Sequence, residues 1–421
     1  MLYAYCAAGP FGFEEMISTS GPGMSLLFLI LVPWLFALPM SLATSEMATA
    51  MPVEGGFYRW TRAAFGDFLG YQCGFWNWTG TFLMNAAYAV ALADYVAQLA
   101  PVVSHGWRHW MVALFFLLLV AALNIRGVQI VGNVTKILLL SVLIPVGIFT
   151  VLGFMHMQAN PFVPLTPPGK PWREVYGVGL ALALWLYSGY EQLSTITEEV
   201  EKPERNFPLG LAIMVPLAMI TFLLPIMAGV GGSDWQQWTT GYIVTAAKNI
   251  GGSWLAIAMF AAAMISVLLG LQTTLLSGAR LPFTMAEDGY FHSSLARLHD
   301  RFRTPVLGIL LSTALCACLA VFTLPQLIAV YMWLRVSTSV LTLLSVWRLR
   351  YIAPDIPRSF KIPGGTFGIA AVVLIPSALF SWALINGERS ALPWGLLCLA
   401  LGPISYLLAR PSASRAIAAE E

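Results

Sequence analysis

Long runs of apolar residues, separated by short polar stretches, dominate the chain. A run of about 20 apolar residues is long enough to cross a bilayer as a helix. By this measure the pattern predicts an all-α membrane protein with twelve transmembrane helices. The predicted spans are 2–18, 23–49, 65–99, 110–124, 127–155, 174–195, 208–231, 252–278, 306–323, 326–347, 366–386 and 391–409.

Composition agrees with a surface that mostly faces lipid. Of the 421 residues, 58% are hydrophobic and 10% are charged, whereas soluble proteins carry about 25% charged residues. The net charge of +2 gives no indication of a nucleic-acid partner. The five cysteines lack the spacing of a zinc site or a redox motif, and the sequence contains no phosphate-binding glycine-rich loop. We therefore expect no metal and no cofactor.

Basic residues are divided unevenly between the two sets of loops. Fifteen Lys and Arg lie in the loops on one side of the predicted membrane and five lie in the loops on the other. The positive-inside rule places the richer side in the cytoplasm. With twelve crossings, both termini are then cytoplasmic, including the polar tail 411–421. We expect a multi-pass protein of the plasma (inner) membrane.

Two short patterns interrupt apolar spans with a carboxylate. Gly-Phe-Glu occurs at 12–14 in the first span, and Gly-Tyr-Glu occurs at 189–191 in the sixth. A charge inside a span is costly and usually faces a cavity, an ion or a substrate. Glycine permits a helix to break, and Gly9 and Pro10 precede the first pattern. Broken helices in corresponding positions indicate the binding site of a secondary transporter. We expect the two breaks to face each other near the bilayer midplane.

Three carboxylates supply the chemistry of this predicted site: Glu14, Glu15 and Glu191. A carboxylate beside aromatic rings suits an ammonium group, because it adds a charge-assisted hydrogen bond to a cation–π contact. Pro10 supplies no N–H, which makes the first break a poorer anion site. The alternative for Glu14 and Glu15 is an ordinary helix start, where both favour the helix dipole. The expected partner is a small amine, either an amino acid or a polyamine.

Five motifs occur along the chain in an order typical of one group of permeases. They are Pro-Val-Glu-Gly-Gly-Phe-Tyr at 52–58, Tyr-Ser-Gly-Tyr-Glu at 187–191, Glu-Val-Glu-Lys-Pro at 199–203, Ala-Glu-Asp-Gly at 286–289 and Arg-Ser-Phe-Lys-Ile-Pro at 358–363. The chain thereby resembles the amino acid–polyamine–organocation (APC) superfamily. The resemblance implies two inverted five-helix repeats, at 1–155 and 174–348, with helices one and six broken. It also implies two peripheral helices, at 366–410.

Two stretches, 9–14 and 74–95, resemble the polyamine-transporting branch of that superfamily. The resemblance places the substrate between the two breaks. In this interpretation the carboxylates bind ammonium groups, aromatic side chains wall the site and glycines permit the breaks. The wall residues are Trp76, Tyr88 and Tyr190, and the glycines are Gly9, Gly12 and Gly189.

Two basic residues lie inside predicted spans. In proton-coupled members of the superfamily, a lysine in the fifth helix occupies the position where relatives place sodium, so the resemblance makes Lys136 the candidate coupling residue. The alternative is that Lys136 snorkels to the membrane surface. Arg335, in the tenth span, is also assigned to the site. It either forms a gate salt bridge with Glu14, Glu15 or Glu191, or binds a substrate carboxylate.

Together these features predict a secondary active permease that moves an amino acid or a polyamine by alternating access, coupled to protons. Three alternatives stay open. The chain is an exchanger of amino acids or amines, a non-transporting membrane sensor of amines, or a membrane-embedded enzyme. The last requires a nucleophile or metal constellation that the sequence does not contain.

Overall fold

The computed structural model of the chain describes residues 9–53, 55–190, 203–387 and 389–417, and within these ranges it contains helices and no strands. Side chains are described there except at 128–136, 174, 203–204, 207 and 410–417. The predicted all-α fold class is confirmed.

Nine helical segments within the described residues are long and apolar enough to cross a membrane. The first runs from Pro22 to Ala50 and joins α3 (Pro22–Val32), a π-helical turn (Pro33–Ala37) and α4 (Leu38–Ala50). The other eight are α6 (Asp67–Leu99), α7 (Gly106–Ile125), α8 (Val128–Met155), α10 (Pro203–Gly231), α12 (Ser253–Glu287), α14 (Leu324–Ile352), α15 (Gly365–Asn386) and α16 (Leu392–Ile417).

Shorter helices occupy the remaining predicted spans. The sixth and ninth spans contain α9 (Trp172–Leu186) and α13 (Val306–Leu319). The first contains α2 (Glu15–Ser20), which has only six residues. Helices α5 (Phe57–Phe65) and α11 (Tyr242–Gly251) lie between spans. Each predicted span therefore contains helix, while the count of twelve crossings and the inverted repeats stay predictions.

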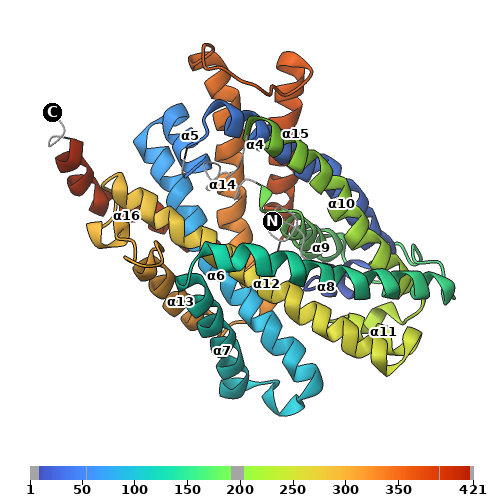
Figure 1. Cartoon of the computed structure of the whole chain (residues 1–421). Helices are drawn as coiled ribbons and strands as arrows, with labels where there is room; N and C mark the ends of the chain where they lie inside the picture. The colour runs from blue at the N-terminus through green and yellow to red at the C-terminus, as the bar shows by residue number, and fades with distance from the viewer. Residues whose placement is uncertain (1–8, 54, 191–202, 388, 418–421) are drawn as a thin grey trace.

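Helices α6 and α14 form the centre of the bundle. Helix α6 packs against α5, α7, α12 and α14, and α14 also contacts α15 and α16. In Figure 1, α5 and the connection between α14 and α15 lie at the top, and the connection between α6 and α7 lies at the bottom. The most apolar stretch of α6 is 67% buried, against 22% for α8 and 17% for α16. Because α8 and α16 are apolar on their exposed faces, we expect those faces to contact lipid.

The end of the bundle at the top of Figure 1 is held by a buried carboxylate. Glu46 on α4 is fully buried and accepts hydrogen bonds from Arg350 Nε at 2.7 Å and from Ile362 N at 2.8 Å. Arg358 Nε lies 3.5 Å from the same carboxylate. These contacts join α4 to the end of α14 and to the segment between α14 and α15. The loop charges predict that this end is cytoplasmic.

A close approach joins α2, which follows the first predicted break, to α9, which precedes the second. Ser20 Oγ donates a hydrogen bond to Val175 O at 2.6 Å. A Cβ added to Gly179 would lie 1.9 Å from Ser20 Oγ, so only glycine fits at this position. Small residues let helices approach closely within a membrane. The spacing of α2 from α9 therefore depends on one glycine.

Replacing Gly179 with valine is expected to push α2 away from α9 and to lower the free energy of unfolding by about 1–3 kcal/mol, the usual cost of overpacking. The measurement is thermal unfolding of the purified protein in detergent. Gly147→Val is the matched control, because a Cβ at Gly147 meets no atom within 4 Å. Equal melting temperatures for the two variants would contradict the prediction.

Candidate functional site

The backbone is irregular at both predicted breaks. Residues 9–14 precede α2 without regular helix, and Gly9 and Gly12 adopt φ values of +136° and +90°. Helix α9 ends at Leu186, and Gly189 adopts a φ of +113°. Positive φ values of this kind are accessible to glycine at little cost. The glycine pattern therefore predicted where regular helix stops, within the described residues.

The first break packs against the end of α9, just before the second break, and a cavity of about 80 Å³ lies between the two breaks and helices α6, α12 and α14. A Cβ at Gly12 would lie 3.4 Å from the Trp185 ring. The volume is several times the about 10–15 Å³ that one water needs. The lining includes Gly9 and Phe11 from the first break and Ser188 and Gly189 from the second.

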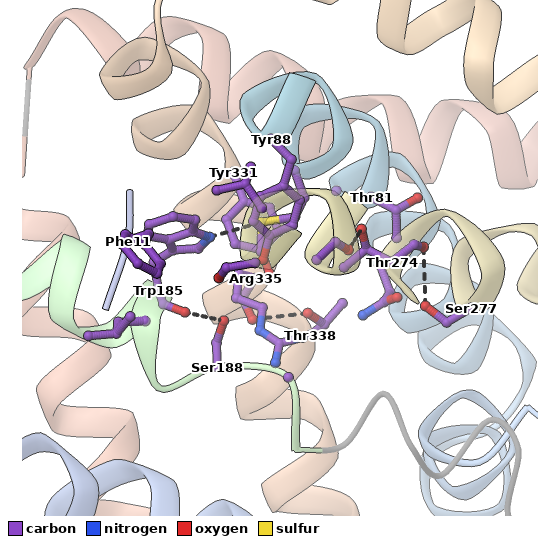
Figure 2. A pocket seen from close by; sticks show the side chains of 18 of the residues that line it. Phe11, Thr81, Tyr88, Trp185, Ser188, Thr274, Ser277, Tyr331, Arg335 and Thr338 are labelled. Atoms are coloured by element: carbon purple, nitrogen blue, oxygen red, sulfur yellow. Dashed lines mark hydrogen bonds between the residues drawn. The ribbon is translucent and has the colours of Figure 1, made fainter. Parts of the chain in front are cut away.

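Aromatic side chains form one wall of this central cavity. Figure 2 shows Phe11 and Trp185 together on one side, with Tyr88 and Tyr331 above the centre. The rings of Tyr88 and Trp185 lie 6.2 Å apart, and Trp185 Nε1 donates to Met84 Sδ at 2.9 Å. Rings held in this way offer their faces to an alkyl chain or to a cation.

Hydroxyl groups form much of the remaining wall, and their protons are already engaged. Thr81 donates to Trp78 O at 2.6 Å, Ser188 donates to Trp185 O at 2.7 Å, and Thr338 donates to Arg335 O at 2.9 Å. On α12, Ser277 likewise donates to a carbonyl of its own helix, and Thr274 donates to Asn85 Oδ1 or to Gly270 O. A hydroxyl whose proton is used retains lone pairs that accept. These walls therefore suit a ligand that donates hydrogen bonds.

Arg335 is the one charged side chain among the described residues that line the central cavity. It extends from α14 and is 2% exposed, and Figure 2 shows it near the centre of the group of lining residues. A guanidinium keeps its charge when buried. The described lining of the central cavity therefore includes one cationic group.

Glu14 binds the protein's own groups and does not line the central cavity. The side chain is fully buried. Its Oε2 accepts from Gly12 N at 2.8 Å, and its Oε1 accepts from Tyr95 Oη at 2.7 Å and from Gly241 N at 3.4 Å. These contacts join the first break to α6 and to the loop before α11. Its predicted role as an ammonium ligand stays a prediction.

The other predicted site residues are distributed differently. Glu15 begins α2 and lines a second cavity, which is separate from the central one. Tyr190 is fully buried and is absent from the lining of the central cavity. Trp76 and Tyr88 do line it, although Trp76 Nε1 donates to Leu399 O of α16 at 3.0 Å. Glu191 and the side chain of Lys136 lie outside the described residues.

Sequence reasoning missed the hydroxyl-bearing wall because serine and threonine are common in membrane helices. One signal was present on α12, where lining residues recur at the spacing of a single helix face. These residues are Ser266, Gly270, Thr274 and Ser277. The pattern would have marked this face as facing a cavity rather than lipid.

Comparisons with known proteins extend over most of the chain. A family model described as amino acid permease matches residues 2–404. The polyamine transporter RMV1 of Arabidopsis thaliana is 30% identical, over 90% of this chain and 77% of that protein. The polyamine transporter PUT1 of Oryza sativa is 28% identical, over 96% and 75%. The methylthioribose transporter of Bacillus subtilis is 22% identical, over 95% and 89%. The resemblance expected from the motifs is confirmed.

Replacing Glu14 with glutamine is expected to lower the free energy of unfolding by about 1–3 kcal/mol, because the new NH2 group would face the N–H of either Gly12 or Gly241 and leave a buried donor unsatisfied. The measurement is thermal unfolding in detergent. Glu15→Gln, at the next position, is the matched control, and loss of its helix-dipole contact costs about 0.3–1 kcal/mol. If Glu14→Gln instead melted like the wild type, the structural role assigned to this carboxylate would be wrong.

Proposed function

Because the chain belongs to the amino acid permease family, we propose that this transporter is a secondary active carrier of a small amine, either a polyamine or an amino acid. Alternating access around the central cavity would move the substrate across the plasma membrane. Both termini would lie in the cytoplasm. The two five-helix repeats, 1–155 and 174–348, would each contribute one break to the site.

The observation that carries this proposal is the pairing of aromatic rings with hydroxyl oxygens in the central cavity. An ammonium group is a donor with three protons and no acceptor. The hydroxyls of Thr81, Ser188 and Thr338 present acceptors, because their own protons are donated to carbonyls. Tyr88 and Trp185 add ring faces for the cation and its alkyl chain. A donor-rich, partly apolar amine matches both walls.

The two candidate substrate classes have different support. The relatives that are named as polyamine transporters favour a polyamine. Arg335 favours an amino acid, because its guanidinium in the cavity wall attracts a carboxylate. In a polyamine carrier, Arg335 would instead form the gate salt bridge with Glu14, Glu15 or Glu191 that the sequence leaves open.

Proton coupling is part of the proposal and rests on the sequence, with Lys136 as the coupling residue. A lysine inside a span loses its proton easily when buried. The expected cycle has a proton and the substrate moving through one alternating conformational change. The alternatives are exchange of one amine for another without a proton, and a sensor that binds an amine without moving it.

Reconstituted protein tests the transport proposal directly. Proteoliposomes loaded with unlabelled 1,4-diaminobutane or L-arginine should accumulate the labelled compound by counterflow. Net uptake in sodium-free buffer should require an imposed proton gradient. Thr81→Val should reduce uptake by about tenfold, because it removes an acceptor for a charged donor.

Thr221→Val is the matched control for Thr81→Val, since Thr221 on α10 also donates to the carbonyl three residues earlier, that of Ala218, but does not line the central cavity. Absence of counterflow for every amine would favour the sensor. A sodium requirement would remove proton coupling from the proposal. Equal uptake by the two variants would remove the hydroxyl wall from the site.

Arg335→Gln separates the two substrate classes. If Arg335 binds a carboxylate, the variant should bind L-arginine about tenfold more weakly than the wild type does. It should bind 1,4-diaminobutane at least as tightly as the wild type, because a positive charge has been removed from the wall. The measurement is competition between the two compounds for the purified protein. Weaker binding of 1,4-diaminobutane with unchanged binding of L-arginine would reject the carboxylate role.

A further inference from the structure

A second, larger cavity lies at the opposite end of the bundle from Glu46. It encloses about 840 Å³ where α6 ends, α7 begins and α13 passes into α14. This volume falls within the range of about 300–1,000 Å³ typical of small-molecule sites. The loops at this end carry few basic residues, and the loop charges predict that it faces away from the cytoplasm. We call it the outer cavity.

The carboxylates of the outer cavity come from Asp94 and Glu15. His105 and His109 line it too, and no Lys or Arg appears among its described lining residues. Asp94 Oδ1 lies 2.9 Å from His109 Nε2. Its Oδ2 has no hydrogen-bond partner in the part of the chain that the structure describes, and the side chain is 34% exposed. One carboxylate oxygen is thus held in place while the other is available to a ligand.

The outer cavity also has a fixed aromatic wall. Trp110 lines it, and Trp110 Nε1 donates to Ala317 O of α13 at 2.8 Å, which orients the indole. Trp107 also lines the outer cavity. Its ring lies 5.7 Å from the guanidinium of Arg108, and Arg108 is not a lining residue. Carboxylates beside an indole face form the combination that binds organic ammonium groups.

Tyr95, the residue after Asp94 on α6, contacts two residues of the first break. Asp94 precedes Tyr95, whose hydroxyl donates to Glu14. Tyr95 packs edge-on against Phe11, with ring centroids 6.4 Å apart, and Phe11 lines the central cavity. A cation held by Asp94 would therefore lie one residue along α6 from the contact between Tyr95 and Phe11.

We propose that the outer cavity is a second binding site, which takes the ammonium group of an organic amine. Asp94 and Glu15 are its anionic ligands and Trp110 is its aromatic wall. An acidic cavity of this kind raises the local concentration of a cation before it reaches the interior. The inference goes beyond the proposed function, because it holds whether or not the central cavity carries an amine.

Isothermal titration calorimetry of the whole chain in detergent, with 1,4-diaminobutane as the ligand, tests the outer site. The wild type should bind the diamine, and Asp94→Asn and Glu15→Gln should each weaken one binding event by about tenfold. Asp234→Asn is the matched control, an exposed carboxylate of the α10–α11 loop that does not line the cavity. The uncharged probe 1,4-butanediol has the same length and should not bind.

Several outcomes would overturn the outer site. These are unchanged binding in both Asp94→Asn and Glu15→Gln, equal weakening by Asp234→Asn, or equally tight binding of 1,4-butanediol. Melting temperatures without the probe show whether each variant is folded. Failure of the proposed function gives a different pattern, in which Thr81→Val leaves diamine binding unchanged while Asp94→Asn still weakens it.

Discussion

The carboxylate of Glu14 is the contact on which the first break depends. Burying a charge without partners is costly, and here two N–H groups and one phenol hydroxyl donate to its two oxygens. Because the donors come from the break itself, from α6 and from the loop before α11, the carboxylate joins three separate parts of the chain. Phe11 is positioned by the same joint, since its ring packs on Tyr95.

Irregular backbone is tolerated within a membrane only where it is buried in protein or lines a cavity. Both breaks meet this condition. Gly179 brings α2 against α9, and the glycine at position 12 lies against Trp185 at the end of α9. The central cavity is the space that two neighbouring interruptions leave between themselves and the long helices α6, α12 and α14.

Besides Glu14, three groups of charged side chains lie at different levels of the bundle among the described residues. A guanidinium, Arg335, lies at the central cavity, two carboxylates line the outer cavity, and Glu46 binds Arg350 at the other end. Breaking the pair of Glu46 and Arg350 is costly because the fully buried carboxylate would lose its partner. Opening this end would therefore require α4 to separate from the end of α14 and from the segment that follows it.

The sequence alone determined the fold class, the approximate helix ranges, the positions of both glycine breaks and the family, because each follows from local spacing or from short motifs. The contacts of the predicted acids were decided by the tertiary structure. Glu14 meets Tyr95, 81 residues away, and Gly241, 227 residues away, while its neighbour Glu15 lines a different cavity. Adjacent residues on a helix point in different directions, and which partner each one meets depends on distant segments. Hydrophobic periodicity identifies helices but carries no information about such long-range contacts, so it could not show that hydroxyls, rather than carboxylates, form the described polar wall of the central cavity.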